Sequence, residues 1–273
     1  MARLKTPLEV YKLLPRTNCG GCGISTCMAF AACVIKQEKK LSGCPHLAKD
    51  TVREYEGHIE GQVNLERIQE EKLRELQSGI ASMDLPARAP MLGGRVSGAS
   101  LVIRCLGRDF EVDCRGAVSS PCHTHAWFSI PLLDHILVSN GSSPNGRWVP
   151  LRELPNGQTW SRLFEQRCEK PLKQLADAHG DLFEDLISMF SGRATPATFN
   201  SDISVVLYPL PRVPVLVCYW KREEDMESKL HLFFDDTAES HLHIDSLFTL
   251  ATGIVMMLEK IMRKHSDGKS VLP

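Results

Sequence analysis

Four cysteines near the start of the chain have a spacing that strongly limits what this segment can be. Cys19, Cys22, Cys27 and Cys44 form the pattern Cys-x2-Cys-x4-Cys-x16-Cys. Four thiolates can hold Zn²⁺ or an iron–sulfur cluster. Structural zinc sites usually have two closely spaced pairs, whereas here three cysteines lie close together and the fourth is far along the chain. The spacing favours a [4Fe–4S] cluster, with zinc or unligated thiols as the alternatives.

The residues around these cysteines predict two short helices. Residues 6–9, Thr-Pro-Leu-Glu, combine an N-cap, an early proline and a capping-box glutamate, and Pro15 ends that helix. A second helix is expected from Cys27, where the helix dipole stabilises an anionic thiolate. Glycines at positions 20, 21 and 23 allow turns that direct backbone N–H groups toward sulfur. Cys33 falls on another side of this helix, so we expect it to be a packed apolar residue, with a redox role as the alternative.

These residues together resemble a known family. Residues 8–23, 26–31 and 44–45 are similar to the [4Fe–4S] domain of the corrinoid iron–sulfur protein large subunit, which serves the acetyl-CoA pathway of anaerobes. A similar domain occurs in the ferredoxin-like subunit of Rnf electron-transport complexes. The resemblance covers roughly residues 5–48. It implies that Cys19, Cys22, Cys27 and Cys44 are the cluster ligands, but it does not extend to the barrel and cobamide-binding regions of the corrinoid protein.

The remainder of the chain, about residues 95–265, resembles a domain of unknown function found in anaerobic bacteria and archaea, often beside this cluster motif. The similar segments are residues 211–215, 219–220, 232–235 and 241–247. This resemblance implies no reaction.

The sequence predicts four parts in order. They are a cluster domain (1–48), a connecting helix (49–83), a linker (84–97) and a mixed domain (98–266). The apolar stripe of the connecting helix, which includes Val52, Tyr55, Ile59 and Val63, is expected to dock on the body or to form a homodimer seam. Prolines and glycines between residues 84 and 94 predict the linker.

The mixed domain is expected to be α+β. Its helical and strand patterns alternate without a repeated strand–helix–strand unit, which disfavours a doubly wound sheet. Strands are expected at residues 101–105, 110–114, 203–207, 215–220 and 230–234. Helices are expected at 132–138, starting near Pro131, across 160–190 with a break or kink at Pro171, and from a cap at Asp245 to about residue 263.

The group in this domain that most resembles a metal-binding site consists of Cys122, His123 and His125, with His241 or His243 as distant partners. Neighbouring ligands without a second closely spaced pair are weak evidence, so a polar loop is the favoured interpretation.

Three acidic residues and one arginine raise further questions of chemistry. Asp235, Asp236 and Asp245 could serve acid–base catalysis, but a strand-end turn and a helix cap are favoured. Arg212, between two prolines, fits a solvent-facing turn better than an anion site. No Walker-type phosphate loop or GxSxG motif marks an enzyme.

Charge and hydropathy narrow the class of protein. A net charge of −1 provides no overall attraction to nucleic acid. No apolar run reaches the length of a membrane span, and no signal core follows the first residues, so a cytoplasmic location is expected. The favoured function is one-electron transfer or redox sensing in anaerobic metabolism, with an unidentified redox partner protein. The alternatives are a binding module with a structural cluster and a redox enzyme with its active centre in the C-terminal domain.

Overall fold

The computed structural model describes residues 4–59, 65–121, 124–224 and 226–266. The chain forms two compact units, residues 1–69 and 70–273, and it contains both helices and sheets, as the α+β prediction requires. Within the described ranges, no helix combines the length and the apolar character that a bilayer span needs.

The N-terminal unit is built from short helices. Its elements are α1 (Pro7–Leu13), α2 (Cys27–Ile35), a 3-10 turn (Leu41–Gly43), α3 (Lys49–Tyr55) and a second 3-10 turn (Glu56–His58). The predicted capping box starts α1, because the Thr6 side chain accepts the Glu9 N–H and the Glu9 carboxylate accepts the Thr6 N–H. Fully buried Val10, Ala31 and Ile35 pack the two helices together, with Phe30 almost fully buried beside them.

The segment predicted as one connecting helix is divided. After α3, the chain tightens into the 3-10 turn that contains Gly57, a residue that weakens α-helix. Helix α4 (Leu65–Ala81) forms the second part, and the stripe residue Val63 lies outside the described residues. Leu76 and Ile80 of α4 are buried in the core of the C-terminal unit, so a homodimer seam could not use them.

The predicted linker 84–97 is instead regular structure. Asp84 caps helix α5 (Leu85–Leu92), Pro86 lies in its first turn, where proline is tolerated, and Gly93 ends it with φ 68°. Strand β1 (Arg95–Ser97) follows directly. Pro86 and Gly93 therefore lie at the two ends of a helix, and Pro90 lies inside it, so this segment is not an unstructured connection.

Two antiparallel sheets organise the C-terminal unit. The first has the order β1-β2-β3-β4, with β2 (Ser100–Cys105), β3 (Arg108–Val112) and β4 (Val118–Ser119). The second has the order β5-β9-β8-β7-β6, with β5 (Trp148–Pro150), β6 (Arg193–Ala194), β7 (Ile203–Leu210), β8 (Val213–Trp220) and β9 (Lys229–Asp235). The predicted hairpins and third strand are confirmed.

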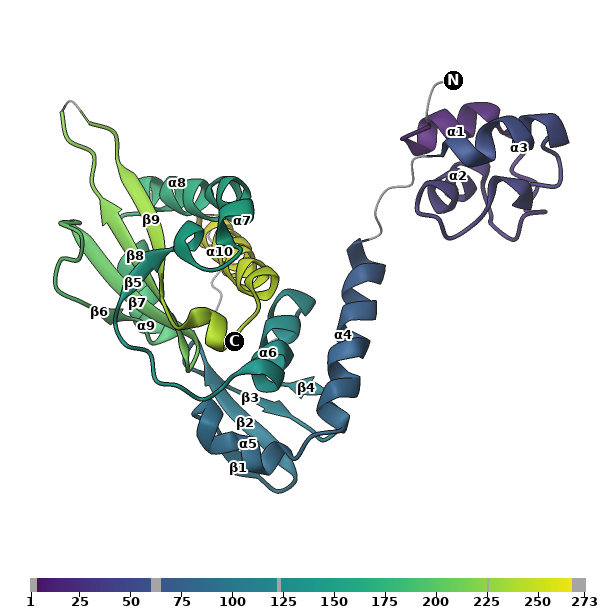
Figure 1. The fold of residues 1–273 in the computed structure, drawn as a ribbon. Helices are drawn as coiled ribbons and strands as arrows, with labels where there is room; N and C mark the ends of the chain where they lie inside the picture. The colour runs from purple at the N-terminus through teal and green to yellow at the C-terminus, as the bar shows by residue number, and fades with distance from the viewer. Residues whose placement is uncertain (1–3, 60–64, 122–123, 225, 267–273) are drawn as a thin grey trace. The chain divides into compact units, whose positions relative to one another are not determined.

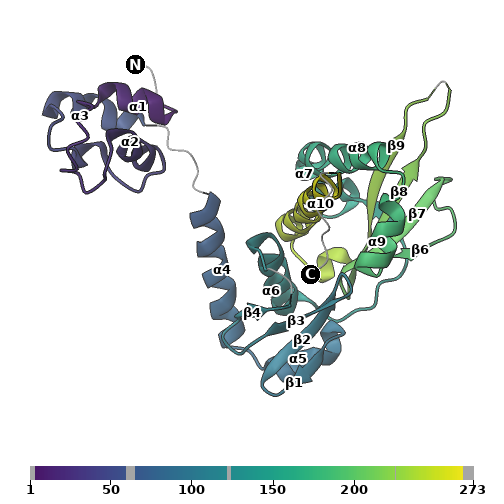
Figure 2. The same ribbon diagram turned by 180° about the vertical axis from the view of Figure 1, so that it is seen from behind.

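Helices cover one face of the five-stranded sheet. They are α7 (Gly157–Phe164), α8 (Lys170–Ala178), α9 (Leu182–Phe190) and α10 (Ile244–Ser266). Figure 1 shows α7, α8 and α10 gathered on this face, and Figure 2 shows α9 beside β7. Their apolar side chains share one core with α6 (Ala126–Val138) and the inner residues of both sheets.

Three helical expectations differ from the structure. Helix α6 begins at Ala126 and carries Pro131 inside it rather than at its start. A π-helical turn (Glu165–Glu169) joins α7 to α8 just before Pro171, so the helix is irregular but unbroken there, and the break lies at residues 179–181 instead. Asp245 lies within the first turn of α10, and His243 O accepts the first helical hydrogen bond from Leu247.

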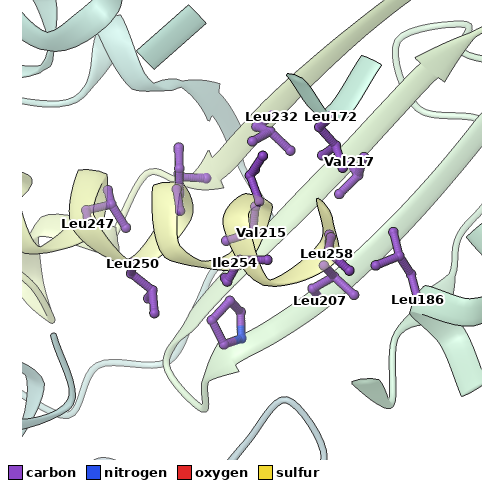
Figure 3. Close-up of a pocket in the computed structure, with 14 residues that line it drawn as sticks. Leu172, Leu186, Leu207, Val215, Val217, Leu232, Leu247, Leu250, Ile254 and Leu258 are labelled. Atoms are coloured by element: carbon purple, nitrogen blue, oxygen red, sulfur yellow. The ribbon is translucent and has the colours of Figure 1, made fainter. Parts of the chain in front are cut away.

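An apolar cavity lies between α10 and the sheet. Figure 3 shows Leu250, Ile254 and Leu258 of α10 facing leucine and valine side chains of β7, β8 and β9. The cavity volume is about 20 Å³, which is room for about one water molecule. Its lining offers no polar partner for a water, so we interpret it as a dry packing defect rather than a ligand site.

Candidate metal centre

The four predicted ligands come from three parts of the N-terminal unit. Cys19 and Cys22 lie in the loop between α1 and α2, Cys27 is the first residue of α2, and Cys44 follows the first 3-10 turn. All four lie within the described residues and carry free thiols. Helix α2 ends after nine residues, early enough for the chain to return to its own core at Cys44.

One small core holds three of these cysteines. Cys27 and Cys44 are each 7% exposed and belong to the same apolar cluster, against which half-buried Cys22 packs. Cys19 and the neighbouring residues from Pro15 to Gly21 are exposed. The arrangement therefore has two thiols anchored in the core and one side that opens to solvent.

Glycine 21 brings two parts of the site into close contact. A Cβ atom at Gly21 would lie 3.1 Å from Pro45 Cγ and 3.6 Å from Cys19 Sγ. The Cys19 sulfur and the residue after Cys44 therefore flank the same point of the loop. Gly20 and Gly23 adopt φ values of 72° and 80°, which favour glycine, as the sequence predicts for this loop.

Two side chains accept backbone N–H groups in the first turn of α2. Thr26 Oγ1 accepts the Ala29 N–H at 3.1 Å, and Asn18 Oδ1 accepts the Cys27 N–H at 2.8 Å. The positive end of the helix dipole lies at Cys27, which is the first residue of α2. The sequence does not single out Asn18, which precedes the predicted ligand Cys19, although asparagine is common in turns and helix caps.

Cys19 and Cys33 lie in opposite electrostatic surroundings. The backbone N–H of Gly21 and the hydroxyl of Thr17 lower the pKa of the Cys19 thiol. Burial and the Glu38 carboxylate raise the pKa of the Cys33 thiol. Cys33 is half-buried and lies outside the apolar cluster that holds Cys27 and Cys44. Its surroundings therefore favour the protonated thiol, whereas those of Cys19 favour a thiolate.

The donor set fits an iron–sulfur cluster, since four free thiols on one compact domain are its usual ligands. In the described ranges, no three His, Cys, Asp or Glu side chains converge where they could hold one metal ion. This includes the four cysteines, whose sulfur atoms do not meet at a single point. The four cysteines would hold an iron–sulfur cluster by binding its iron atoms as thiolates.

Comparison with known proteins separates the chain into the same two parts. A family described as a domain of unknown function (DUF3786) matches residues 84–257, which is more than half of the chain. The chain belongs to the DUF3786 family. A second family, described as an Fe-S cluster domain, matches residues 14–46 and supports an iron–sulfur cofactor in the N-terminal unit of this DUF3786 protein. No solved structure matches.

Several curated relatives are gamma subunits of the acetyl-CoA decarbonylase/synthase complex. The subunit from Methanosarcina acetivorans is 54% identical over 48 residues, 18% of this chain and 10% of the relative. Gamma subunit 2 from Methanosarcina thermophila is 38% identical over 92 residues, 34% of this chain and 18% of the relative. The subunit from Archaeoglobus fulgidus is 46% identical over 52 residues, which are 19% of this chain and 11% of the relative. The chain thus spans less than a fifth of these relatives.

The second metal group considered from sequence is only partly described. Cys122 and His123 lie outside the described residues, and His125 occupies the N-cap position of α6. Both histidines considered as distant partners have hydrogen bonds elsewhere. His241 is buried between the hydroxyls of Ser139 and Ser142, at 2.8 and 3.3 Å. The ring and backbone N–H groups of His243 both donate to the buried Asp134 carboxylate.

The acidic residues considered for catalysis have structural roles where they are buried. Asp235 is fully buried at the end of β9. Its carboxylate accepts the N–H groups of Asn145, Gly146 and Thr237 and the Thr237 hydroxyl, which confirms the strand-end turn. Arg212 lies in the predicted turn, but its guanidinium donates to Met91 O at 3.3 Å and Ser143 Oγ at 3.1 Å rather than facing only solvent.

The burial of His135, which lies next to His241, predicts that the stability of the C-terminal unit depends on pH. Its Nδ1–H donates to His241 O at 3.0 Å, while Nε2 has no hydrogen-bond partner among the described residues. Burial lowers the pKa of His135 from 6.5 to about 4. As the pH falls, the unfolded state therefore binds a proton at a higher pH than the folded state does. Stability falls as the pH drops from about 6.5 to about 4. The free energy of unfolding should fall by about 3 kcal/mol over this pH range.

Urea unfolding across this pH range, followed by tryptophan fluorescence, tests this expectation. All four tryptophans lie beyond residue 100, so the signal reports the C-terminal unit. His135→Asn removes the titrating ring, and we expect a much flatter pH dependence. Burial also lowers the pKa of His241, which leaves a residual slope. An unchanged slope in His135→Asn would show that His135 does not carry the effect.

Proposed function

We propose that the N-terminal unit holds a [4Fe–4S] cluster through Cys19, Cys22, Cys27 and Cys44 and transfers single electrons in anaerobic metabolism. The observation that carries the proposal is the division of these thiols between core and surface. Buried Cys27 and Cys44 anchor one side of the site, and exposed Cys19 leaves its other side at the solvent. Such a cofactor supplies a one-electron couple whose potential depends on nearby hydrogen bonds and solvent exposure.

The chain's own groups are suited to stabilise negative charge at this site. The first turn of α2 directs its dipole toward Cys27, and the Gly21 N–H and Thr17 hydroxyl favour the thiolate of Cys19. These groups stabilise the more negative, reduced state and so raise the potential. The exposed loop gives a redox partner protein a short path to the site.

The biological setting proposed here follows the relatives. They are named as subunits of a complex, so we expect a protein partner for this chain as well, in the cytoplasm of an anaerobe. The DUF3786 domain is the candidate for docking that partner. A homodimer through residues 49–83 is a further proposal, for which the exposed Ile68 remains available.

Reversible reduction tests electron transfer directly. The protein is purified without oxygen and its EPR spectrum is recorded before and after dithionite, then again after reoxidation. We expect a signal that appears on reduction and disappears on reoxidation. A cluster that is present but not reduced would contradict electron transfer and favour a binding module with a structural cluster.

A further inference from the structure

Asn18 joins the two ends of the loop that carries the first three cysteines. It directly precedes Cys19, and its Oδ1 atom accepts the N–H of Cys27, nine residues along the chain, at 2.8 Å. One short side chain therefore connects the backbone beside one proposed ligand to the backbone of another. Among the described residues, Asn18 is the side chain whose hydrogen bond reaches a cysteine N–H at this site.

The backbone at Asn18 supports this role. Its φ of 49° lies in the left-handed region, which asparagine adopts more readily than most residues. The Cys27 N–H is one of the first amide groups of α2, which have no partner within the helix. The hydrogen bond from Asn18 therefore satisfies α2 and holds the loop at the same time.

We propose that Asn18 is a positioning residue for the cluster, because its bond to Cys27 holds the Cys19–Cys22 loop against the start of α2. The inference rests on the proposed function and adds a residue that is not itself a ligand. Without this bond the exposed Cys19 end of the loop loses its hydrogen bond to the start of α2, and the packing of Cys22 on the core remains. The cofactor would then be released more readily.

Three variants of the full chain separate this role from backbone strain. Asn18→Gly removes the acceptor at a position where glycine is conformationally favoured. Arg16→Gly is the matched control, since Arg16 has a φ of 59° in the same loop but stacks over the Tyr11 ring instead of binding Cys27. Asn18→Asp keeps a side-chain oxygen at the helix N-terminus and adds a negative charge.

The variants are loaded without oxygen, and iron loss to an excess of ferrozine is timed alongside a measurement of the reduction potential. Asn18→Gly should lose iron about tenfold faster than the wild type, as expected for one lost hydrogen bond. Arg16→Gly and Asn18→Asp should lose iron at the wild-type rate. Asn18→Asp should also have a more negative potential, because its charge disfavours the reduced state. That shift reports that the added charge lies close to the cluster, while the rates of iron loss report the positioning.

Several outcomes would overturn the inference. They are wild-type iron retention in Asn18→Gly, equally fast loss from Arg16→Gly, and failure of Asn18→Asp to retain iron or shift the potential. A wild-type protein that holds iron but cannot be reduced would contradict electron transfer alone, since the comparison of iron loss still stands. A wild-type protein without iron would overturn both proposals.

Discussion

Replacing Cys44 by serine is expected to remove the cluster and unfold the N-terminal unit. Cys44 is 7% exposed within the same core as Cys27, so the substitution removes a proposed ligand and buries a hydroxyl. A core of this size supplies only about 3 to 5 kcal/mol, too little to tolerate the loss of the cofactor. Iron and acid-labile sulfide per chain should fall to near zero.

Cys33→Ser is the matched control for Cys44→Ser. Cys33 lies half-buried on α2, in surroundings that favour its thiol form. Its replacement by serine should therefore leave the iron content unchanged. The tryptophan-detected unfolding of the C-terminal unit should be the same in both variants, because all four tryptophans belong to that unit. Full iron retention in Cys44→Ser would show that Cys44 is not a ligand.

Gly253→Ala is expected to destabilise the C-terminal unit strongly, although alanine is a better helix former than glycine. A Cβ atom at this position of α10 would overlap the indole ring of Trp127. The ring or the helix must move, which costs about 3 kcal/mol. That cost exceeds the gain of about 1 kcal/mol in helix propensity. Thermal unfolding followed by circular dichroism measures the net change.

Two comparisons isolate the contact between Gly253 and Trp127. Gly180→Ala meets open space among the described residues and should leave stability nearly unchanged. In a Trp127→Ala background, Gly253→Ala should be close to neutral, because every Trp127 atom that the new Cβ would overlap is gone. Equal destabilisation by Gly253→Ala in both backgrounds would contradict the assigned contact.

Local signals in the sequence predicted much of the fold. The capping box at Thr6 and Glu9 starts α1, and Cys27 starts α2, as expected from neighbouring residues alone. The alternating segments predict the β2–β3 hairpin, and two apolar segments joined by a proline-containing turn predict β7 and β8. Prolines account for the differences at α5 and α6. The sequence predicts boundaries at Pro86, Pro90 and Pro131, but these prolines lie within the two helices.

Contacts between distant residues were not predictable from the sequence. Asp134 and His243 are separated by 109 residues, yet they form a pair at 2.7 Å. The close approach of the Trp127 ring to Gly253 likewise depends on how α6 and α10 pack. The proposed cluster ligands, in contrast, could be named because their spacing is itself a local signal. Asn18 lies in that same segment, but its role depends on a turn geometry that composition does not reveal.

The most direct test of the account is a count of iron and acid-labile sulfide in the full chain, purified without oxygen. We expect about four iron atoms and about four sulfides per chain, the composition of a [4Fe–4S] cluster. Zinc in place of iron, with no acid-labile sulfide, would contradict the cluster and leave a zinc-binding domain joined to the DUF3786 domain.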